Sequence, residues 1–311
     1  MNTKKPVDVA CYVSTGSSPW KDWLDFSAWL CENSAVPVID FHTHVFPPDI
    51  IAQREAYLQR DDWFRRLYAD PRARMVTAED LVASMDRGGV DAAVTFGFAW
   101  ADQGLCRATN DYVVEAVSRW PDRLLGFAVV NPAAESAAQE LERCMQKGLC
   151  GLGELMPDGQ GYALDDPRLD DVVRLATRWK RPVLVHAGEP VGHTYPGKSK
   201  STLQGFYGLA LRHPEAVLVA AHWGGGLLFY ELMPEVRQAL KNVFYDTAAS
   251  LYLYDDAIFS LAARIVPDKV LFGTDYPLID QERFLSCVRR SGLTLSAQQS
   301  MLGGNAARVL Q

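Results

Sequence analysis

The chain has 311 residues, of which 48% are hydrophobic and 22% charged, with 31 Lys and Arg against 38 Asp and Glu. This length fits either two ordinary domains or one α/β barrel. The net charge of −7, without a Lys- or Arg-rich run, argues against a nucleic-acid-binding surface. No stretch of about 18 consecutive apolar residues occurs, so no segment is expected to cross a membrane.

Six cysteines are scattered along the chain, and none of them forms a CxxC pair. Such spacing favours reduced thiols in a cytoplasmic protein over a disulfide framework or a zinc ribbon. Pro6 and Asp8 follow Lys4 and Lys5 where a secretory signal would have an apolar segment, so no signal is expected. These features predict a cytoplasmic enzyme with a small-molecule substrate and neither a nucleic-acid nor a membrane partner.

Residues 1–36 are predicted to form an N-terminal extension. Trp20, Trp23 and Trp29 recur there at roughly helical spacing, together with Leu24 and Leu30. This pattern predicts a short amphipathic helix. The helix would pack either on the body of its own chain or on a second subunit, and in the second case the protein would be a homo-oligomer.

From Val38 onward, short apolar runs alternate with longer helical patterns. The runs are 38–41, 90–96, 124–130, 151–155, 182–185, 216–221, 243–245 and 270–272. Because 232 residues separate Val38 from Val270, seven steps average about 33 residues, the size of one βα unit. Near-continuous apolar runs indicate parallel strands covered on both faces. The sequence therefore predicts a (β/α)8 barrel over residues 37–311, with an open doubly wound sheet as the alternative.

Helix ends and long connections support this reading. Thr77 is followed three residues later by Asp80, a variant of the capping box, and Asp166 with Pro167 begins another helix. Two connections, 45–75 and 188–201, are longer than the regular spacing of the βα units requires, and both follow predicted strands. Barrel enzymes place their active sites at this end of the strands.

Five polar side chains stand at the ends of predicted strands. His42 and His44 end the first strand, His186 the fifth, His222 the sixth and Asp275 the eighth. Side chains two apart on a strand share a face, and the carboxyl ends of barrel strands converge on one small volume. Imidazoles with a carboxylate suit a borderline divalent ion such as Zn²⁺. The pattern therefore predicts a metal centre in the barrel mouth, with one position left to water.

Four further residues are candidate substrate contacts. Glu189 and His193 lie in the connection after the fifth strand, and Trp223 and Tyr276 follow the sixth and eighth strands. Packing at the barrel rim is the alternative for the two aromatic residues, and a plain loop position is the alternative for His193. His213 is instead predicted to lie on the surface at the C-terminus of a helix.

Several motifs carry a resemblance to a known family. They are DFHTH at 40–44, VH at 185–186, AHWGGG at 221–226, FGTDYP at 272–277 and GNAARVL at 304–310. In these motifs the chain resembles the amidohydrolase superfamily. It is most similar to the amidohydrolase-related branch, which contains aminocarboxymuconate-semialdehyde decarboxylase and its hydrolase relatives. The resemblance spans about 37 to 311 and is specific to the superfamily rather than to a substrate.

The resemblance implies roles for the strand-end residues. His42, His44, His186 and Asp275 would bind the metal, and His222 would polarise a substrate oxygen or move a proton. Asp275 would also accept the proton of metal-bound water. The expected cofactor is one Zn²⁺ ion, with Mn²⁺ as the alternative.

Glu154 ends the fourth strand and bears on the number of ions. In two-metal members of the superfamily a carboxylate from this strand bridges the ions, so a second ion is expected if Glu154 bridges. Otherwise Glu154 would hold a ligand histidine or contact the substrate.

The primary hypothesis is a metal-dependent hydrolase, in which metal-activated water attacks an ester, lactone or amide carbonyl. The alternative is a non-oxidative decarboxylase of a small unsaturated or aromatic carboxylic acid that uses the same metal site. A carboxylate-binding arginine at the mouth would favour decarboxylation. The candidates in the first long connection are Arg54, Arg60, Arg65, Arg66, Arg72 and Arg74. A metal fully capped by protein ligands would instead indicate a binding protein without catalysis.

Overall fold

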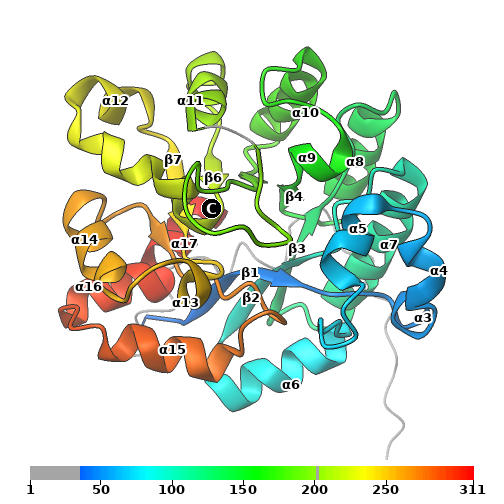
Figure 1. Cartoon of the computed structure of the whole chain (residues 1–311), viewed down its shortest axis with the longest axis horizontal. Coiled ribbons are helices and arrows are strands. Elements are labelled where there is room, and N and C mark those ends of the chain that lie inside the picture. The colour runs from blue at the N-terminus through cyan, green and yellow to red at the C-terminus, as the bar shows by residue number, and fades with distance from the viewer. Residues whose placement is uncertain (1–35, 201–202) are drawn as a thin grey trace, which may run out of the picture.

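The computed structural model describes residues 36–200 and 203–311, which form one barrel of parallel strands surrounded by helices (Figure 1). The strands are β1 (Ile39–His44), β2 (Ala92–Phe96), β3 (Leu124–Ala128), β4 (Gly151–Leu155), β5 (Val183–Val185), β6 (Leu218–Ala220), β7 (Val243–Asp246) and β8 (Val270–Leu271). They pair in chain order from β1 to β8. Each predicted apolar run overlaps one strand, and the (β/α)8 barrel is confirmed.

Hydrogen bonds beyond the last strand bring β8 against β1 and nearly close the barrel. The amide of Phe41 donates to the carbonyl of Phe272 at 2.7 Å, and the amide of Asp275 donates to the carbonyl of His42 at 2.9 Å. The buried carboxylate of Asp40 accepts hydrogen bonds from the amide and the hydroxyl of Thr274, at 2.9 and 2.6 Å. These contacts place Asp275 beside the histidines of β1.

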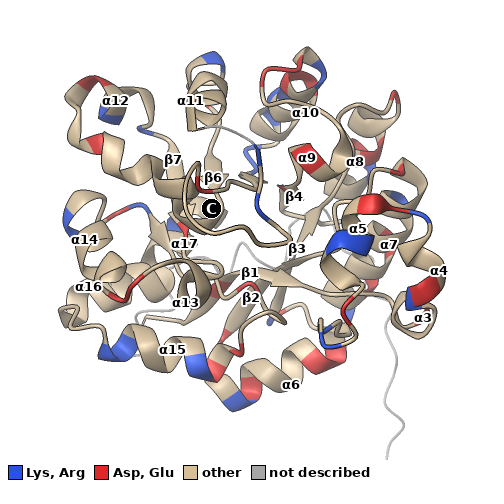
Figure 2. Ribbon diagram, in the orientation of Figure 1, with Lys and Arg blue, Asp and Glu red and all other residues tan. Residues whose placement is uncertain are grey.

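Helices cover the outside of the barrel. The main ones are α6 (Ala78–Gly88), α7 (Gln103–Arg119), α8 (Ala137–Gln146), α10 (Pro167–Arg178), α11 (Leu203–Arg212), α12 (Pro234–Ala239), α14 (Ala257–Ile265) and α15 (Gln281–Arg290). The predicted capping box is present at the start of α6, where Thr77 and Asp80 exchange hydrogen bonds, and Asp166 caps α10. Basic and acidic residues are interspersed around these helices and form no single-sign face in this view (Figure 2).

Shorter elements connect the strands and helices. They are α9 (Pro157–Gln160), η1 (His222–Leu232), α13 (Ser250–Leu253), α16 (Leu295–Gln299), η2 (Ser300–Gly304) and α17 (Asn305–Leu310). In η1 the backbone of Gly225 is left-handed, and a side chain there would collide with the carbonyl oxygen of Gly188. The GGG motif thus lets the connections after β5 and β6 approach each other. At the opposite end of the barrel, the side-chain amide of Asn305 in α17 donates to the carbonyl of Val270 at 2.9 Å.

The long connection after β1 folds into three short helices, α3 (Pro48–Ala52), α4 (Arg54–Leu58) and α5 (Asp62–Tyr68). Asp61 begins α5, because its carboxylate accepts a hydrogen bond from the amide of Phe64 at 2.8 Å. Phe46, Phe64 and Phe98 pack together around the end of α5. Phe98 of this cluster lines the barrel mouth.

Three predictions concern the chain outside the barrel. The amphipathic helix around Trp20–Leu30 and the extension 1–36 lie outside the described residues, apart from Val36. The four cysteines in the described part, Cys106, Cys144, Cys150 and Cys287, are free thiols. None of the described helices is both long and apolar enough to cross a lipid bilayer.

Candidate metal centre in the barrel mouth

An extra residue in β1 turns His42 into the barrel. Asp40 pairs with Ala93 and Thr43 with Thr95, so three steps along β1 match two along β2. Both Phe41 and His42 therefore lie in the bulged part of the strand, and bulges of this kind re-aim side chains next to active sites. The pairing of β4 with β5 has the same irregularity: three steps from Leu152 to Leu155 match two steps along β5, and Glu154 lies within them.

The first group of candidate ligands consists of His42, His44 and Asp275. The Nε2 atoms of His42 and His44 are 3.2 Å apart. The Oδ1 atom of Asp275 lies 3.3 Å from His44 Nε2 and 3.7 Å from His42 Nε2. Two ligand atoms bound at about 2.1 Å to a tetrahedral ion would be about 3.4 Å apart, so these three atoms are spaced as ligands of one ion.

The second group consists of Glu154, His186 and His222. Glu154 Oε1 is 2.9 Å from His186 Nδ1 and 3.6 Å from His222 Nε2, and the two imidazole nitrogens are 3.1 Å apart. The structure thus places His186 beside Glu154 and His222 rather than in the first group.

Glu154 lies between the two groups. Its other oxygen, Oε2, is 3.7 Å from His42 Nε2 and 3.8 Å from His44 Nε2. One carboxylate therefore contacts both groups, with a different oxygen for each.

Hydrogen bonds on the outer side of three imidazoles leave the inward nitrogen free to bind a metal. Asp246 Oδ2 is 2.8 Å from His42 Nδ1. The carbonyl oxygen of Ala248 is 3.1 Å from His222 Nδ1, and that of Gly197 is 3.0 Å from His186 Nε2. A carbonyl accepts only from N–H, so when their rings are neutral His186 and His222 turn a lone pair to the centre, and Asp246 favours the same arrangement for His42. The donor set fits a divalent metal ion.

The pKa values show how strongly these groups interact. Burial lowers the pKa of His42, but the neighbouring carboxylates, chiefly Asp246, raise it to about 10. Burial likewise lowers the pKa of His222, but its hydrogen bond with Glu154 and the charge of Asp275 raise it to about 9. Burial raises the pKa of Asp275, yet the surrounding imidazoles lower it to about 2. The metal-free site therefore combines protonated imidazoles with ionised carboxylates.

The metal-free and metal-loaded proteins should respond differently to pH. Because His42 and His222 have raised pKa values, their contribution to the stability of the metal-free fold is complete below pH ~6.5 and is lost as the pH rises through about 9 to 10. Metal binding requires neutral imidazoles, so it tightens over the same range. We expect the Tm difference between Zn²⁺-loaded and chelator-treated protein to widen from pH ~6 to pH ~9. Thermal unfolding followed by circular dichroism measures this, and a constant or narrowing difference would contradict it.

A cavity of about 510 Å³ in the barrel mouth reaches both groups of ligands. Much of its wall is apolar or aromatic, including Leu67, Tyr68, Phe98, Met156, Tyr252 and Leu253. His193 and Gly197, from the connection after β5, line it as well, and so does Arg74, whose guanidinium lies over the ring of Tyr276, 5.6 Å from its centroid. A largely apolar cavity of this volume with a few polar groups is suited to a small molecule.

The other predicted substrate contacts lie away from the cavity wall. Glu189 does not line the cavity, but it accepts a hydrogen bond of 2.6 Å from the hydroxyl of Tyr195, which does. Trp223 is fully buried in the outer core, where its indole N–H donates to the Ser250 hydroxyl at 2.7 Å. Tyr276 is 1% exposed and borders a neighbouring shallow hollow rather than the cavity.

His213 does not lie on the surface. It is buried, and its Nε2 is 2.7 Å from the carboxylate of Asp170 in α10. The surface position predicted for it is therefore wrong, because the preceding pattern showed a helix end but not the acidic partner on the neighbouring helix.

Of the six candidate arginines, Arg74 is the one that lines the cavity. All six contact protein groups: Arg74 the ring of Tyr276, Arg54 the carbonyl of Ala73, Arg65 the carboxylate of Asp62, Arg72 that of Asp70, Arg60 the ring of Tyr57 and Arg66 the ring of Trp63. Lys198 is likewise engaged, since its ammonium donates to the carbonyls of Val191, Gly192 and His193. Spacing in the sequence carried no signal that would have singled out Arg74 or Tyr68.

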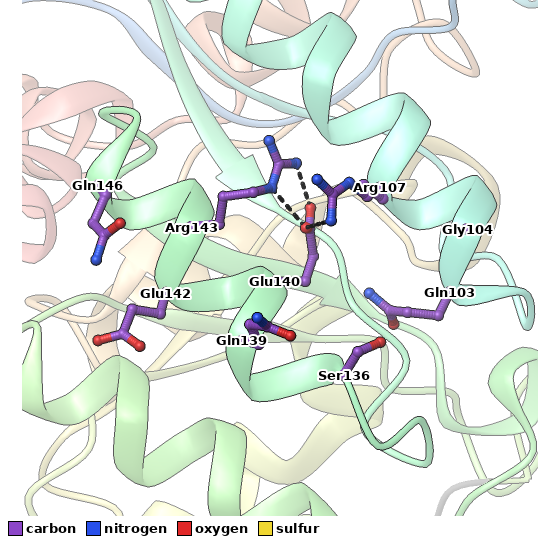
Figure 3. A pocket seen from close by; sticks show the side chains of 9 residues that line it. All are labelled: Gln103, Gly104, Arg107, Ser136, Gln139, Glu140, Glu142, Arg143 and Gln146. Atoms are coloured by element: carbon purple, nitrogen blue, oxygen red, sulfur yellow. Dashed lines mark hydrogen bonds and ion pairs between the residues drawn. The ribbon is translucent and has the colours of Figure 1, made fainter.

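A second hollow, of about 520 Å³, lies between α7 and α8 on the outside of the barrel (Figure 3). Its buried carboxylate, Glu140, accepts two hydrogen bonds of 2.7 Å from Arg143 and lies 3.9 Å from Arg107. The side-chain amide of Asn110 also donates to Glu140, at 2.9 Å. These charges are matched within the hollow, and within the described residues the metal-ligand groups lie only in the barrel mouth.

A (β/α)8 barrel that gathers histidines and carboxylates at the carboxyl ends of its strands is the architecture of a metal-dependent barrel enzyme. The model of the amidohydrolase family matches residues 39–311, and the chain belongs to this family. The expected superfamily is thereby confirmed.

Known relatives fall in the expected branch. The chain is 25% identical to 2-amino-3-carboxymuconate-6-semialdehyde decarboxylase of Dictyostelium discoideum, covering 88% of this chain and 91% of that protein. It is 21% identical to gamma-resorcylate decarboxylase of Polaromonas sp. (strain JS666 / ATCC BAA-500), covering 88% and 98%. The crystal structure of 5-carboxyvanillate decarboxylase from Sphingomonas paucimobilis shares the fold, with a TM-score of 0.73, 21% identity and coverage of 89% and 99%.

Proposed function

We propose that this chain is a metal-dependent, non-oxidative decarboxylase of a small aromatic or unsaturated carboxylic acid. The observation that carries the proposal is Arg74, an arginine on the wall of a largely apolar cavity that reaches the candidate metal ligands. A guanidinium binds a carboxylate strongly, often through two hydrogen bonds. Hydrolysis is the primary hypothesis from the sequence, whose motifs serve both reactions, but the named relatives are decarboxylases, which supports this alternative.

The metal part of the proposal is one divalent ion, Zn²⁺ or Mn²⁺, held by His42, His44, Asp275 and Oε2 of Glu154. The spacing of these four atoms, 3.2 to 3.8 Å for the measured pairs, supports the assignment. His186, whose Nδ1 is 2.9 Å from Oε1 of Glu154, would then position this carboxylate rather than bind the ion. A structural relative, dihydroxybenzoic acid decarboxylase from Polaromonas sp. JS666, has bound manganese. Metal analysis of protein prepared without chelator should find one ion per chain, whereas two would assign the second to the Glu154–His186–His222 group.

Different residues of the cavity would have different roles in decarboxylation. When bound, the ion supplies positive charge that stabilises negative charge developing on the substrate. Arg74 would anchor a carboxylate, and the apolar walls would hold the planar body and exclude water. As the bond to CO₂ breaks, its electron pair stays on carbon and takes up a proton. His222, which lines the cavity beside the candidate metal ligands, would donate that proton from its protonated ring.

The reaction can be tested by measuring products. Metal-loaded protein should release one CO₂ for each molecule converted among hydroxylated benzoic acids and carboxymuconate-type acids, and chelator-treated protein should release none. Lactones and esters in the same assay test hydrolysis. Turnover of these compounds, without CO₂ release from any of the acids, would assign the chain to the hydrolases.

Arg74→Met should raise KM for the acid about 10- to 100-fold and change kcat little, because a charge-assisted hydrogen bond is worth ~1.5–3 kcal/mol in substrate binding. Steady-state kinetics with the best acid of the panel measures this. Arg72→Met is the matched control, since Arg72 is an exposed arginine of the same connection that pairs with Asp70. An unchanged KM in the Arg74 variant would remove the observation on which the proposal depends.

The cellular setting belongs to the same proposal. The free thiols of Cys106, Cys144, Cys150 and Cys287 support a cytoplasmic location. The partner is the small acid itself. A homo-oligomer stays a prediction, which gel filtration with light scattering of the full chain would test.

A further inference from the structure

Tyr68 ends α5 and presents its phenol to the cavity that also reaches His44, Glu154 and Asp275. Its hydroxyl has no hydrogen-bond partner among residues 36–200 and 203–311. A polar group that lines a largely apolar cavity without a protein partner is free to bind a ligand.

Three aromatic rings fix the side chain of Tyr68. Its ring stacks on Phe64, with centroids 4.8 Å apart and an interplanar angle of 28°. It meets Phe46 and Phe98 edge to face, at 5.2 and 5.9 Å. Because these contacts restrict the ring, the hydroxyl group is held in place before any ligand enters.

The other tyrosines of the cavity wall differ from Tyr68. The hydroxyl of Tyr195 already donates to Glu189 at 2.6 Å. Tyr252 is 52% exposed at the rim. Tyr68 thus combines a fixed ring with an unused hydroxyl.

Tyr68 can act only as a neutral donor. Burial raises its pKa, and the negative charges of Asp275 and Glu154 raise it further. A phenol that stays protonated keeps its O–H hydrogen available for an oxygen acceptor.

We propose that Tyr68 is a specificity-determining residue, whose hydroxyl donates a hydrogen bond to a second oxygen of the substrate. This inference rests on the proposed function: Arg74 and the ion would take the carboxylate, and Tyr68 would select acids that also carry a hydroxyl or oxo group. The physical reason is the cost of leaving the phenol unpaired when a ligand without an acceptor displaces water from it. Sites built to pair with a substrate oxygen reject analogues that lack it.

Binding of two probe acids tests the proposal on the full-length protein as isolated, with added Mn²⁺. Calorimetry would give Kd for 2-hydroxybenzoate and for benzoate. The native protein should bind 2-hydroxybenzoate about tenfold more tightly, and Tyr68→Phe should abolish that preference while changing the benzoate Kd less than about twofold. Phe keeps the ring contacts, so the variant should fold, which its Tm would verify.

Tyr57→Phe is the matched control, because Tyr57 packs on Trp100 in the same aromatic region but does not line the cavity. It should keep the preference of the native protein. Three outcomes would overturn the proposal. The Tyr68→Phe variant could keep the preference, it could bind both acids more weakly by the same factor, or the native protein could fail to bind 2-hydroxybenzoate more tightly than benzoate. The CO₂ assay is independent: a protein that shows the preference but releases no CO₂ would refute the decarboxylase and keep the role of Tyr68.

Discussion

Replacing Asp275 with Asn is expected to lower kcat/KM by about a thousandfold or more and to reduce the bound metal. The carboxylate of Asp275 faces both β1 histidines, with Oδ1 3.3 Å from His44 Nε2 and 3.7 Å from His42 Nε2. An amide has the same shape but no charge, so it would neither bind the ion strongly nor accept a proton, and positioned acid–base groups contribute about 10²- to 10⁴-fold on their own. Kinetics and metal analysis of the purified variant measure the two effects.

The Asp275→Asn variant should still fold. The backbone of Asp275 has a left-handed φ of 61°, a conformation that Asn adopts more readily than most residues. Asp268→Asn, at an exposed position shortly before β8, is the control and should retain metal and activity. Near-normal metal content and turnover in the Asp275 variant would place the metal centre elsewhere.

Asp246→Asn should weaken metal binding about 10- to 100-fold, because Asp246 acts on the metal through His42. Its Oδ2 is 2.8 Å from His42 Nδ1, and its Oδ1 accepts from the backbone amide of His222 at 2.8 Å. An Asn that turned its NH₂ toward Nδ1 would favour a hydrogen on Nε2 and so remove the lone pair that faces the ion. Metal titration with a competing chelator measures the change.

Activity at different metal concentrations separates positioning from catalysis at Asp246. If Asp246 only positions His42, excess metal should restore most of the activity of Asp246→Asn, whereas it should not restore Asp275→Asn. Unchanged metal affinity in the Asp246 variant would show that the orientation of His42 does not depend on this carboxylate.

Local patterns accounted for much of the fold. Strand runs, the capping box of Thr77 and Asp80, and the start of α10 at Asp166 depend on neighbouring residues, so periodicity and capping chemistry revealed them. The strand-end positions of His42, His44, His186, His222 and Asp275 also followed from the strands. Their meeting in one volume is a property of the barrel, which the repeated βα rhythm indicated.

Other features depended on contacts that local patterns do not encode. The extra residues in β1 and β4 appear only when neighbouring strands are paired, and they turn His42 and Glu154 inward. The contact between His42 and Asp246 spans 204 positions along the chain. Six arginines occur in the connection after β1, and only the folded structure shows that Arg74 is the one that reaches the cavity.

By itself, then, the amino-acid order determined the barrel and the side chains that its strand ends carry, because apolar periodicity and helix caps act over a few residues. Tertiary structure alone decided how those side chains divide into two groups around Glu154, and which arginine and which tyrosine face the cavity. Those outcomes depend on strand register and loop packing, which join residues far apart along the chain.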